Sequence, residues 1–98
     1  MKTRVFTENT AENIEAAAAI ICTGGLLGIP TETVYGLGAN ALNEDAVLHI
    51  FEAKGRPQDN PLIIHVPDET WLERYCHDVP DTAYALAAAF WPGPLTMI

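Results

Sequence analysis

Two of the five cations in this acidic chain lie on either side of a glycine, in the sequence Lys54-Gly55-Arg56. Arginine presents a rigid fork of N–H donors that matches phosphate oxygens, and lysine presents a mobile point charge. Gly55 has no Cβ, so a ligand or another backbone segment can approach it closely. Cations at the end of a helix can instead complement the helix dipole. The tripeptide therefore predicts either a small anion site or a charged helix C-terminus.

Three side chains with hydroxyl groups alternate along the segment after Pro30, namely Thr31, Thr33 and Tyr35. In an extended loop, alternate side chains face the same way, and α/β domains usually bind ligands where a buried strand ends. The alternative is a turn rich in Thr and Gly that is held by local hydrogen bonds. His65 lies in an otherwise apolar run, where it is either a ligand contact or a structural core histidine.

Helices and strands alternate along the chain, which predicts an α/β domain that positions these residues. Short apolar runs are the expected strands: Thr3–Phe6, Leu26–Ile29, Leu62–Val66 and Leu95–Ile98. Caps and periodic apolar positions predict the helices: Asn9 to about Thr23, Asn43 to Lys54, Asp68–Tyr75 and Pro80–Phe90.

Local signals mark where these elements begin and end. Asn9 is expected to cap the first helix, and Gly24-Gly25 is expected to end it. The segment Thr31–Gly38 is expected to be a loop. Leu95–Ile98 would open a strand whose neighbours are absent, which indicates a truncated chain.

Composition limits the classes of function. With 98 residues, 49% of them hydrophobic and 18% charged, the chain is typical of one small soluble domain. Its formal net charge of −8 argues against binding nucleic acid by charge alone. The sequence has no apolar run long enough for a membrane span, and its N-terminus has no signal-peptide pattern. A cytoplasmic protein is therefore expected. Cys22 and Cys76 fit no metal or redox spacing, and no metal site is expected.

Three blocks of sequence carry a resemblance to a known family: Ile29–Leu37, Lys54–Val66 and Phe90–Thr96. In their order and approximate spacing they resemble the YrdC-like threonylcarbamoyl-AMP synthases, and the resemblance covers nearly the whole chain. It implies a twisted open α/β sheet with flanking helices. Residues 1–98 would form the N-terminal part of that YrdC-like domain, because the family's later Ser-x-Asn motif is absent.

The resemblance implies a nucleotidyltransferase that converts L-threonine, bicarbonate and ATP, with Mg2+, into L-threonylcarbamoyl-AMP and pyrophosphate. Carried over by motif position, Lys54 and Arg56 would hold the ATP phosphates and act as the catalytic groups, and Asn60 would contact the nucleotide. No residue resembles a covalent nucleophile, so positioning and charge stabilisation would carry the catalysis. Downstream proteins would then transfer the threonylcarbamoyl group to tRNA.

The resemblance also implies a threonine pocket. Thr33 and His65 would contact the amino acid, and Thr31 and Tyr35 would shape the pocket around it. A site that hydrogen-bonds the threonine hydroxyl would reject analogues that lack it, because its own polar groups would then be left unpaired.

Two other functions remain open at this point. A YrdC-like domain of a hydrogenase-maturation carbamoyltransferase would make a carbamoyl-adenylate, although such domains lie in long chains behind cysteine-rich zinc motifs. A non-catalytic YrdC-like module would bind nucleotide or RNA, and the charge of −8 weakens the RNA version. The 98 residues alone are expected to be inactive and to cover their open sheet edge by self-association.

Overall fold

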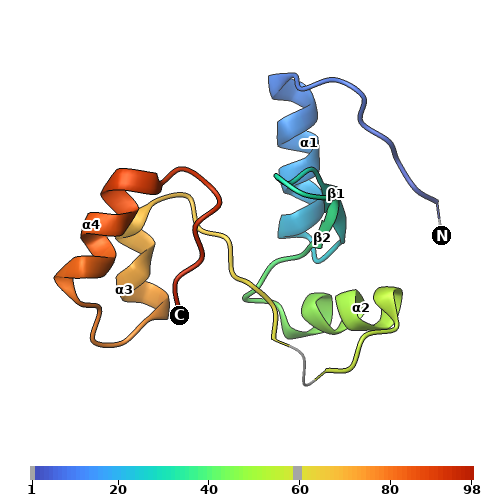
Figure 1. Ribbon diagram of the computed structural model, residues 1–98. Coiled ribbons are helices and arrows are strands. Elements are labelled where there is room, and N and C mark those ends of the chain that lie inside the picture. The colour runs from blue at the N-terminus through green and yellow to red at the C-terminus, as the bar shows by residue number, and fades with distance from the viewer. Residues whose placement is uncertain (1, 59–60) are drawn as a thin grey trace. The chain divides into compact units, whose positions relative to one another are not determined.

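A computed structural model of the chain describes residues 2–58 and 61–98. The chain divides into two compact units, Met1–Pro61 and Leu62–Ile98 (Figure 1). The first unit contains two helices and a two-stranded sheet, and the second contains helices alone among its described residues. Helices and strands thus alternate only in the first unit.

The first helix, α1 (Ala11–Cys22), begins at a different cap from the one expected. Thr10 is the N-cap: its backbone is extended, and its side-chain oxygen accepts the N–H of Asn13 at 3.1 Å. The side-chain amide nitrogen of Asn13, Nδ2, in turn donates to the carbonyl oxygen of Glu8 at 3.0 Å. The prediction that Asn9 is the cap was wrong by one residue, because Thr10 and Asn13 satisfy the helix end together.

The glycine stop after α1 is confirmed. The N–H of Gly25 bonds to the carbonyl of Ile20 at 2.8 Å, and the N–H of Gly24 bonds to the carbonyl of Ile21 at 3.1 Å. These two bonds form a Schellman motif, in which Gly24 takes a left-handed backbone with φ +89°. A Cβ at Gly25 would lie 2.7 Å from Cγ2 of Ile20, so both positions favour glycine.

A short hairpin follows, in which β1 (Leu27–Ile29) pairs antiparallel with β2 (Gly36–Gly38). In the register, Leu27 lies opposite Gly38. The expected strand before Pro30 is confirmed, but the prediction that the chain stays a loop through Gly38 was wrong. Backbone groups of β1 need partners, and β2 supplies them although two of its three residues are glycine.

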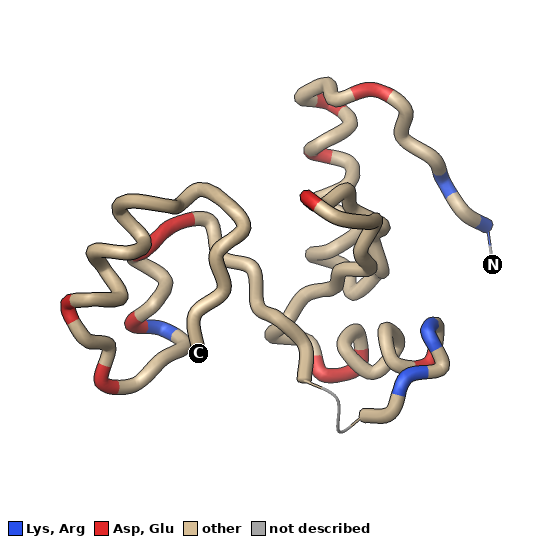
Figure 2. The backbone as a smooth tube through the Cα atoms, in the orientation of Figure 1, with Lys and Arg blue, Asp and Glu red and all other residues tan. Residues whose placement is uncertain are grey.

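The second helix, α2 (Glu44–Lys54), has the predicted ends. The side-chain oxygen of Asn43 accepts the N–H of Ala46 at 3.1 Å, and Gly55 is the C-cap with φ 61° and ψ 31°. The apolar positions that predict this helix are Ala46, Val47, Ile50 and Phe51, and three of them are buried while Val47 is half-buried. Figure 2 marks the backbone positions of Lys and Arg in blue, and two such positions lie at the C-terminal end of this helix and just beyond it, where Lys54 and Arg56 lie.

Gly55 allows a direct test of this left-handed turn. Gly55→Ala is expected to lower the free energy of unfolding by about 1 kcal/mol, because its φ of 61° disfavours a residue with a Cβ. Gly28→Ala is the matched control. A Cβ at either glycine meets nothing within 4 Å, but only Gly55 of the two has a positive φ. Urea unfolding followed by circular dichroism measures both, and equal losses would contradict the explanation.

In the second unit, a 3₁₀ turn, η1 (Glu69–Trp71), continues into α3 (Leu72–Tyr75), and α4 (Asp81–Phe90) follows. Asp68 caps η1 by accepting the N–H of Thr70 at 2.9 Å. Leu72 of α3 and Ala87 of α4 are buried. Both helices expected in this half of the chain are therefore confirmed. Pro80 is the N-cap of α4 and so lies just outside its first turn.

Three expected strands were wrong: Thr3–Phe6, Leu62–Val66 and Leu95–Ile98. All of their residues are described, and none joins the β1–β2 sheet. A strand needs a neighbour to pair its backbone groups, and apolar composition alone does not supply one. Leu95 instead closes a turn, because its N–H bonds to Gly93 and its carbonyl oxygen accepts the Trp91 indole N–H at 3.0 Å.

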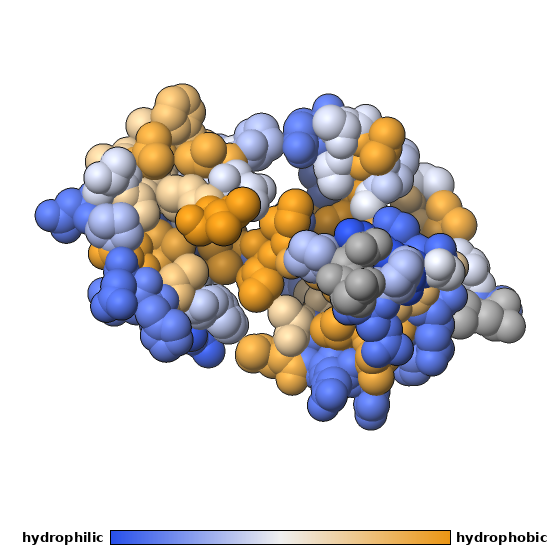
Figure 3. Space-filling model, turned by 60° about the horizontal axis from the view of Figure 1, so that its bottom comes forward, coloured by the Kyte–Doolittle hydropathy of each residue, from blue (hydrophilic) through white to orange (hydrophobic). Residues whose placement is uncertain are grey.

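Both units expose large apolar side chains, some of which are visible as orange surface in Figure 3. Val34 and Tyr35, at the tip of the hairpin, are 74% and 81% exposed. In the second unit Ile63 is 64% exposed and Phe90 is 59% exposed. Singly exposed apolar residues are common on protein surfaces, and larger contiguous patches are what mark binding surfaces.

Candidate functional site

The cation pair lies where α2 ends and the chain turns away. Lys54 is the last helical residue and is exposed, and the N–H of Arg56 bonds to the carbonyl of Phe51 at 2.9 Å. Gly55, between them, has the left-handed backbone that reverses the chain direction. The side chain of Lys54 is in the last turn, where a positive charge complements the helix dipole. The structure thus contains the charged helix end, and it leaves the cations accessible to an anion.

Arg56 is also held by its side chain. One terminal nitrogen of its guanidinium, Nη2, donates to the carbonyl oxygen of Pro61 at 3.1 Å, and the residue is half-buried. A guanidinium carries five N–H donors, so this bond fixes one side of the fork and uses one donor. An arginine held in this way can bind phosphate oxygens with less loss of side-chain freedom than a fully mobile one.

The Pro61 carbonyl is a site component that sequence reasoning missed. A backbone oxygen has no side-chain signature, and the only signal was the placement of Pro57 and Pro61 on either side of the segment. Each proline fixes its own φ angle and restricts the residue before it. Asn60, predicted to contact the nucleotide, lies outside the described residues.

The hydroxyl residues form a bent loop at the tip of the hairpin and do not form an extended one. The hydroxyl oxygens of Thr31 and Thr33 lie 3.3 Å apart, and the N–H of Thr33 reaches Thr31 Oγ1 at 3.3 Å. The hydroxyl of Thr31 also donates to the carbonyl oxygen of Val34. The expected extended segment was therefore wrong, because these local bonds turn the chain, although they bring two of the three predicted hydroxyls together. Tyr35 is 81% exposed.

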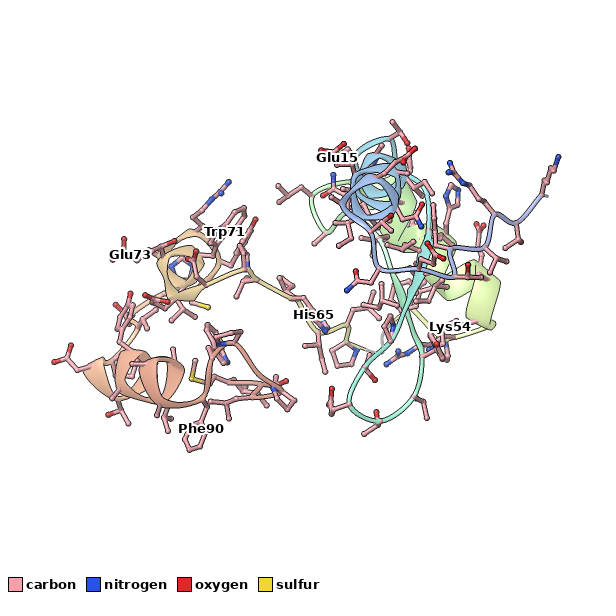
Figure 4. The ribbon with its side chains drawn as sticks, turned by 90° about the horizontal axis from the view of Figure 1, so that it is seen from above. Glu15, Lys54, His65, Trp71, Glu73 and Phe90 are labelled. Carbon is pink, nitrogen blue, oxygen red and sulfur yellow. The ribbon has the colours of Figure 1, made fainter. Side chains whose placement is uncertain are left out.

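His65 belongs to the second unit, on the segment that leads into η1 (Figure 4). It is exposed, and its ring nitrogen Nδ1 lies 3.4 Å from the carbonyl oxygen of Ile63. A buried core histidine is thereby excluded, and the ring is accessible to a ligand. Lys54, Arg56 and the two threonines belong to the first unit.

The second unit contains another cluster of polar and aromatic side chains. The rings of Trp71 and Tyr75 stack with centroids 6.0 Å apart, and the Arg74 guanidinium lies 4.2 Å from the Trp71 ring centroid. Partial withdrawal from solvent, and next the nearby Glu73 carboxylate, raise the pKa of Tyr84 above its ordinary value of 10.0. The Trp71, Arg74 and Tyr75 side chains come from the neighbouring η1 and α3 segments, so their stacking ties these two short elements together.

Two further observations limit the chemistry of the described ranges. Residues 2–58 and 61–98 contain no group of three or more His, Cys, Asp or Glu side chains placed to hold a metal ion. The same ranges contain no helix of the length and hydropathy that a membrane crossing requires. Cys22 and Cys76 are both free and exposed.

Comparison with known proteins places this arrangement in a family. The Sua5/YciO/YrdC family model, whose description is "Telomere recombination", matches residues 19–98. The chain belongs to this family. The matched residues include the hydroxyl loop (Thr31–Tyr35), the cation pair (Lys54 and Arg56) and the whole of the second unit.

Relatives within the Sua5/YciO/YrdC family are close in sequence. The threonylcarbamoyl-AMP synthase of Pyrococcus abyssi is 59% identical over 85 residues, which cover 87% of this chain and 25% of that protein. The threonylcarbamoyl-AMP synthase of Bacillus subtilis is 50% identical over 105 residues, which cover all of this chain and 30% of that protein. The chain therefore spans about a quarter to a third of the length of these relatives.

The fold is also shared with a solved structure of the family. A crystal structure of Pyrococcus abyssi Sua5 complexed with L-threonine has a TM-score of 0.83 and 55% identity, and the match covers 90% of this chain and 26% of that one. The YrdC-like α/β fold class expected from the sequence is confirmed by this likeness. The described part of the present chain contributes two strands of sheet to such a fold.

Proposed function

We propose that this chain provides the phosphate-binding end of α2 and the hydroxyl loop of an L-threonylcarbamoyl-AMP synthase. The observation that carries the proposal is the Lys54-Gly55-Arg56 turn, in which one side of the Arg56 guanidinium is already fixed by Pro61. This turn lies in a chain that aligns over its whole length with a protein named threonylcarbamoyl-AMP synthase. The substrates would be L-threonine, bicarbonate and ATP, and the products L-threonylcarbamoyl-AMP and pyrophosphate.

The chemistry requires charge stabilisation more than acid–base catalysis. The threonine amine adds to CO2 derived from bicarbonate and loses a proton, which gives a carbamate. A carbamate oxygen then attacks the α-phosphorus of ATP, and pyrophosphate leaves with the electrons of the broken P–O bond. Negative charge develops on the phosphate oxygens, where Arg56 and Lys54 can donate hydrogen bonds. Mg2+ would arrive bound to ATP, with the phosphates as its main ligands.

The product of this reaction is short-lived and needs an acceptor. The product is a mixed anhydride of a carbamic acid and AMP, so a downstream transferase must accept the threonylcarbamoyl group before water hydrolyses it. We place that transfer on tRNA and the protein in the cytoplasm. The exposed apolar residues of both units, among them Val34 and Ile63, support contact with a partner surface, including a second copy of the chain.

A hybrid synthase tests the proposal directly. In this hybrid, residues 1–98 replace the segment of the Bacillus subtilis synthase with which they align. The hybrid is expected to form threonylcarbamoyl-AMP and pyrophosphate, both measured by chromatography and mass spectrometry. The parent synthase is the control. A folded hybrid that forms no product while the parent is active would refute the proposal.

Thr33→Val and His65→Ala in the hybrid synthase are each expected to weaken L-threonine binding by roughly two- to tenfold while leaving ATP affinity unchanged. Each change removes one polar contact to the amino acid, and a net hydrogen bond of this kind is worth about 0.5–1.5 kcal/mol. Titration calorimetry with each ligand alone measures both affinities. His77→Ala, which removes another exposed histidine of the second unit, is the control for His65→Ala. Equal losses for threonine and ATP would mean that the residues are structural.

A further inference from the structure

The hydroxyl of Thr31 is fully used inside the hairpin loop. A threonine hydroxyl has one hydrogen to donate and two lone pairs that accept. The hydrogen goes to the carbonyl oxygen of Val34, which can only accept. One lone pair of Thr31 takes the N–H of Thr33 at 3.3 Å, and the second faces the hydroxyl of Thr33, also at 3.3 Å. No hydrogen-bonding position of Thr31 is left for a ligand.

These bonds fix the direction of the neighbouring hydroxyl. Because the single hydrogen of Thr31 is donated to Val34, the contact between the two hydroxyls must use the hydrogen of Thr33. Thr33 is exposed, and with its hydrogen used in this contact its hydroxyl oxygen keeps two lone pairs that can only accept. A group that binds this oxygen has to be a hydrogen-bond donor, because a carboxylate or phosphate oxygen would meet another acceptor.

The methyl group of Thr31 points away from these hydrogen bonds. The methyl carbon, Cγ2, would lie 3.5 Å from a Cβ built at Gly36, so the methyl faces the start of β2 while the hydroxyl faces the loop. Replacing the hydroxyl by a methyl, as in Thr31→Val, keeps the size and branching of the side chain and removes its hydrogen bonds.

We propose that Thr31 is a positioning residue, which holds Thr33 as an acceptor for a hydrogen-bond donor of L-threonine, either its ammonium group or its side-chain hydroxyl. This inference rests on the proposed synthase function and assigns Thr31 no contact with substrate. It explains why two threonines are spaced two residues apart on a bent loop: one closes the bend, and the other faces the ligand.

Two measurements test this role. In the 98-residue chain, the amide NMR signal of Thr33 is expected to shift in Thr31→Val and to stay near its wild-type position in Thr31→Ser, which keeps the hydroxyl. In the hybrid synthase, Thr31→Val is expected to weaken L-threonine binding about tenfold, and Thr31→Ser is expected to restore it to within about threefold. ATP affinity stays unchanged in both variants.

Thr23→Val is the matched control, because the Thr23 hydroxyl also makes only local hydrogen bonds, to the carbonyl oxygens of Ala19 at 2.9 Å and Ile20 at 3.2 Å. It is expected to leave L-threonine affinity unchanged. If Thr31→Val binds L-threonine normally, or if Thr31→Ser binds as weakly as Thr31→Val, the positioning role is overturned and the synthase function stands. If the unmodified hybrid binds no L-threonine, both proposals fail together.

Discussion

Arg56→Ala in the hybrid synthase is expected to lower turnover about tenfold or more, and Lys54→Ala is expected to act in the same direction. Hydrogen bonds to charged groups contribute about 1.5–3 kcal/mol, which corresponds to roughly a tenfold to hundredfold change in rate. Arg56→Lys keeps the charge but loses the planar fork, so its turnover is expected to lie between those of the wild type and Arg56→Ala. Pyrophosphate release at saturating L-threonine and bicarbonate measures all three variants.

A charged helix end makes a different prediction for the same variants. If Lys54 and Arg56 only complement the dipole of α2, their loss costs under about 1 kcal/mol of stability and leaves turnover intact. Lys2→Ala, which removes an exposed cation from the N-terminal segment, controls for the change in net charge. Near-normal turnover in both site variants, together with a small loss of stability, would reject the phosphate site.

The 98-residue chain by itself is expected to form no threonylcarbamoyl-AMP with L-threonine, bicarbonate, Mg2+ and ATP. It spans 25% and 30% of two relatives named as synthases, so most of the length of those proteins is not covered by it. The same chain is expected to self-associate, because Val34, Tyr35, Ile63 and Phe90 are all more than half exposed.

Product analysis and size-exclusion chromatography with light scattering test the two halves of this expectation separately. The hybrid synthase provides the positive control for the assay. A monomeric chain that forms product at the rate of the hybrid would show that the 98 residues contain a complete active site, and it would contradict both expectations.

Helices could be predicted from the sequence because their signals are local. Asn43 and Asp68 cap helices within three residues of themselves, and Gly24 and Gly55 end helices by their own backbone conformation. The one-residue error at Thr10 has the same origin, since adjacent Asn and Thr side chains are both good caps and only the geometry decides between them.

Strands could not be predicted in the same way, because pairing depends on residues far from the strand itself. Gly36–Gly38 has low strand propensity and still pairs with β1, whereas the apolar segment Leu62–Val66 lies in the described part of the chain without a strand partner. Composition identified which segments are apolar, but it could not identify which of them would meet a neighbour.

The side chains of the candidate site could be proposed from the sequence, but the backbone groups that hold them could not. Residue type and spacing made Arg56 and the threonine pair candidates, since phosphate and amino-acid recognition need such donors and acceptors. The bend that makes Thr31 a partner of Thr33, and the carbonyl of Pro61 that holds Arg56, involve backbone atoms. Every residue has a backbone carbonyl, so no pattern of side chains indicates which one will be used.

The bond between Arg56 and Pro61 has a thermodynamic consequence. A free arginine side chain loses up to about 2 kcal/mol of conformational entropy when a ligand immobilises it. Arg56 has lost part of that freedom before any anion arrives, and Pro57 and Pro61 reduce the freedom of the unfolded segment as well. Part of the ordering of this side chain therefore happens on folding, so an anion that binds Arg56 would meet a smaller entropic penalty.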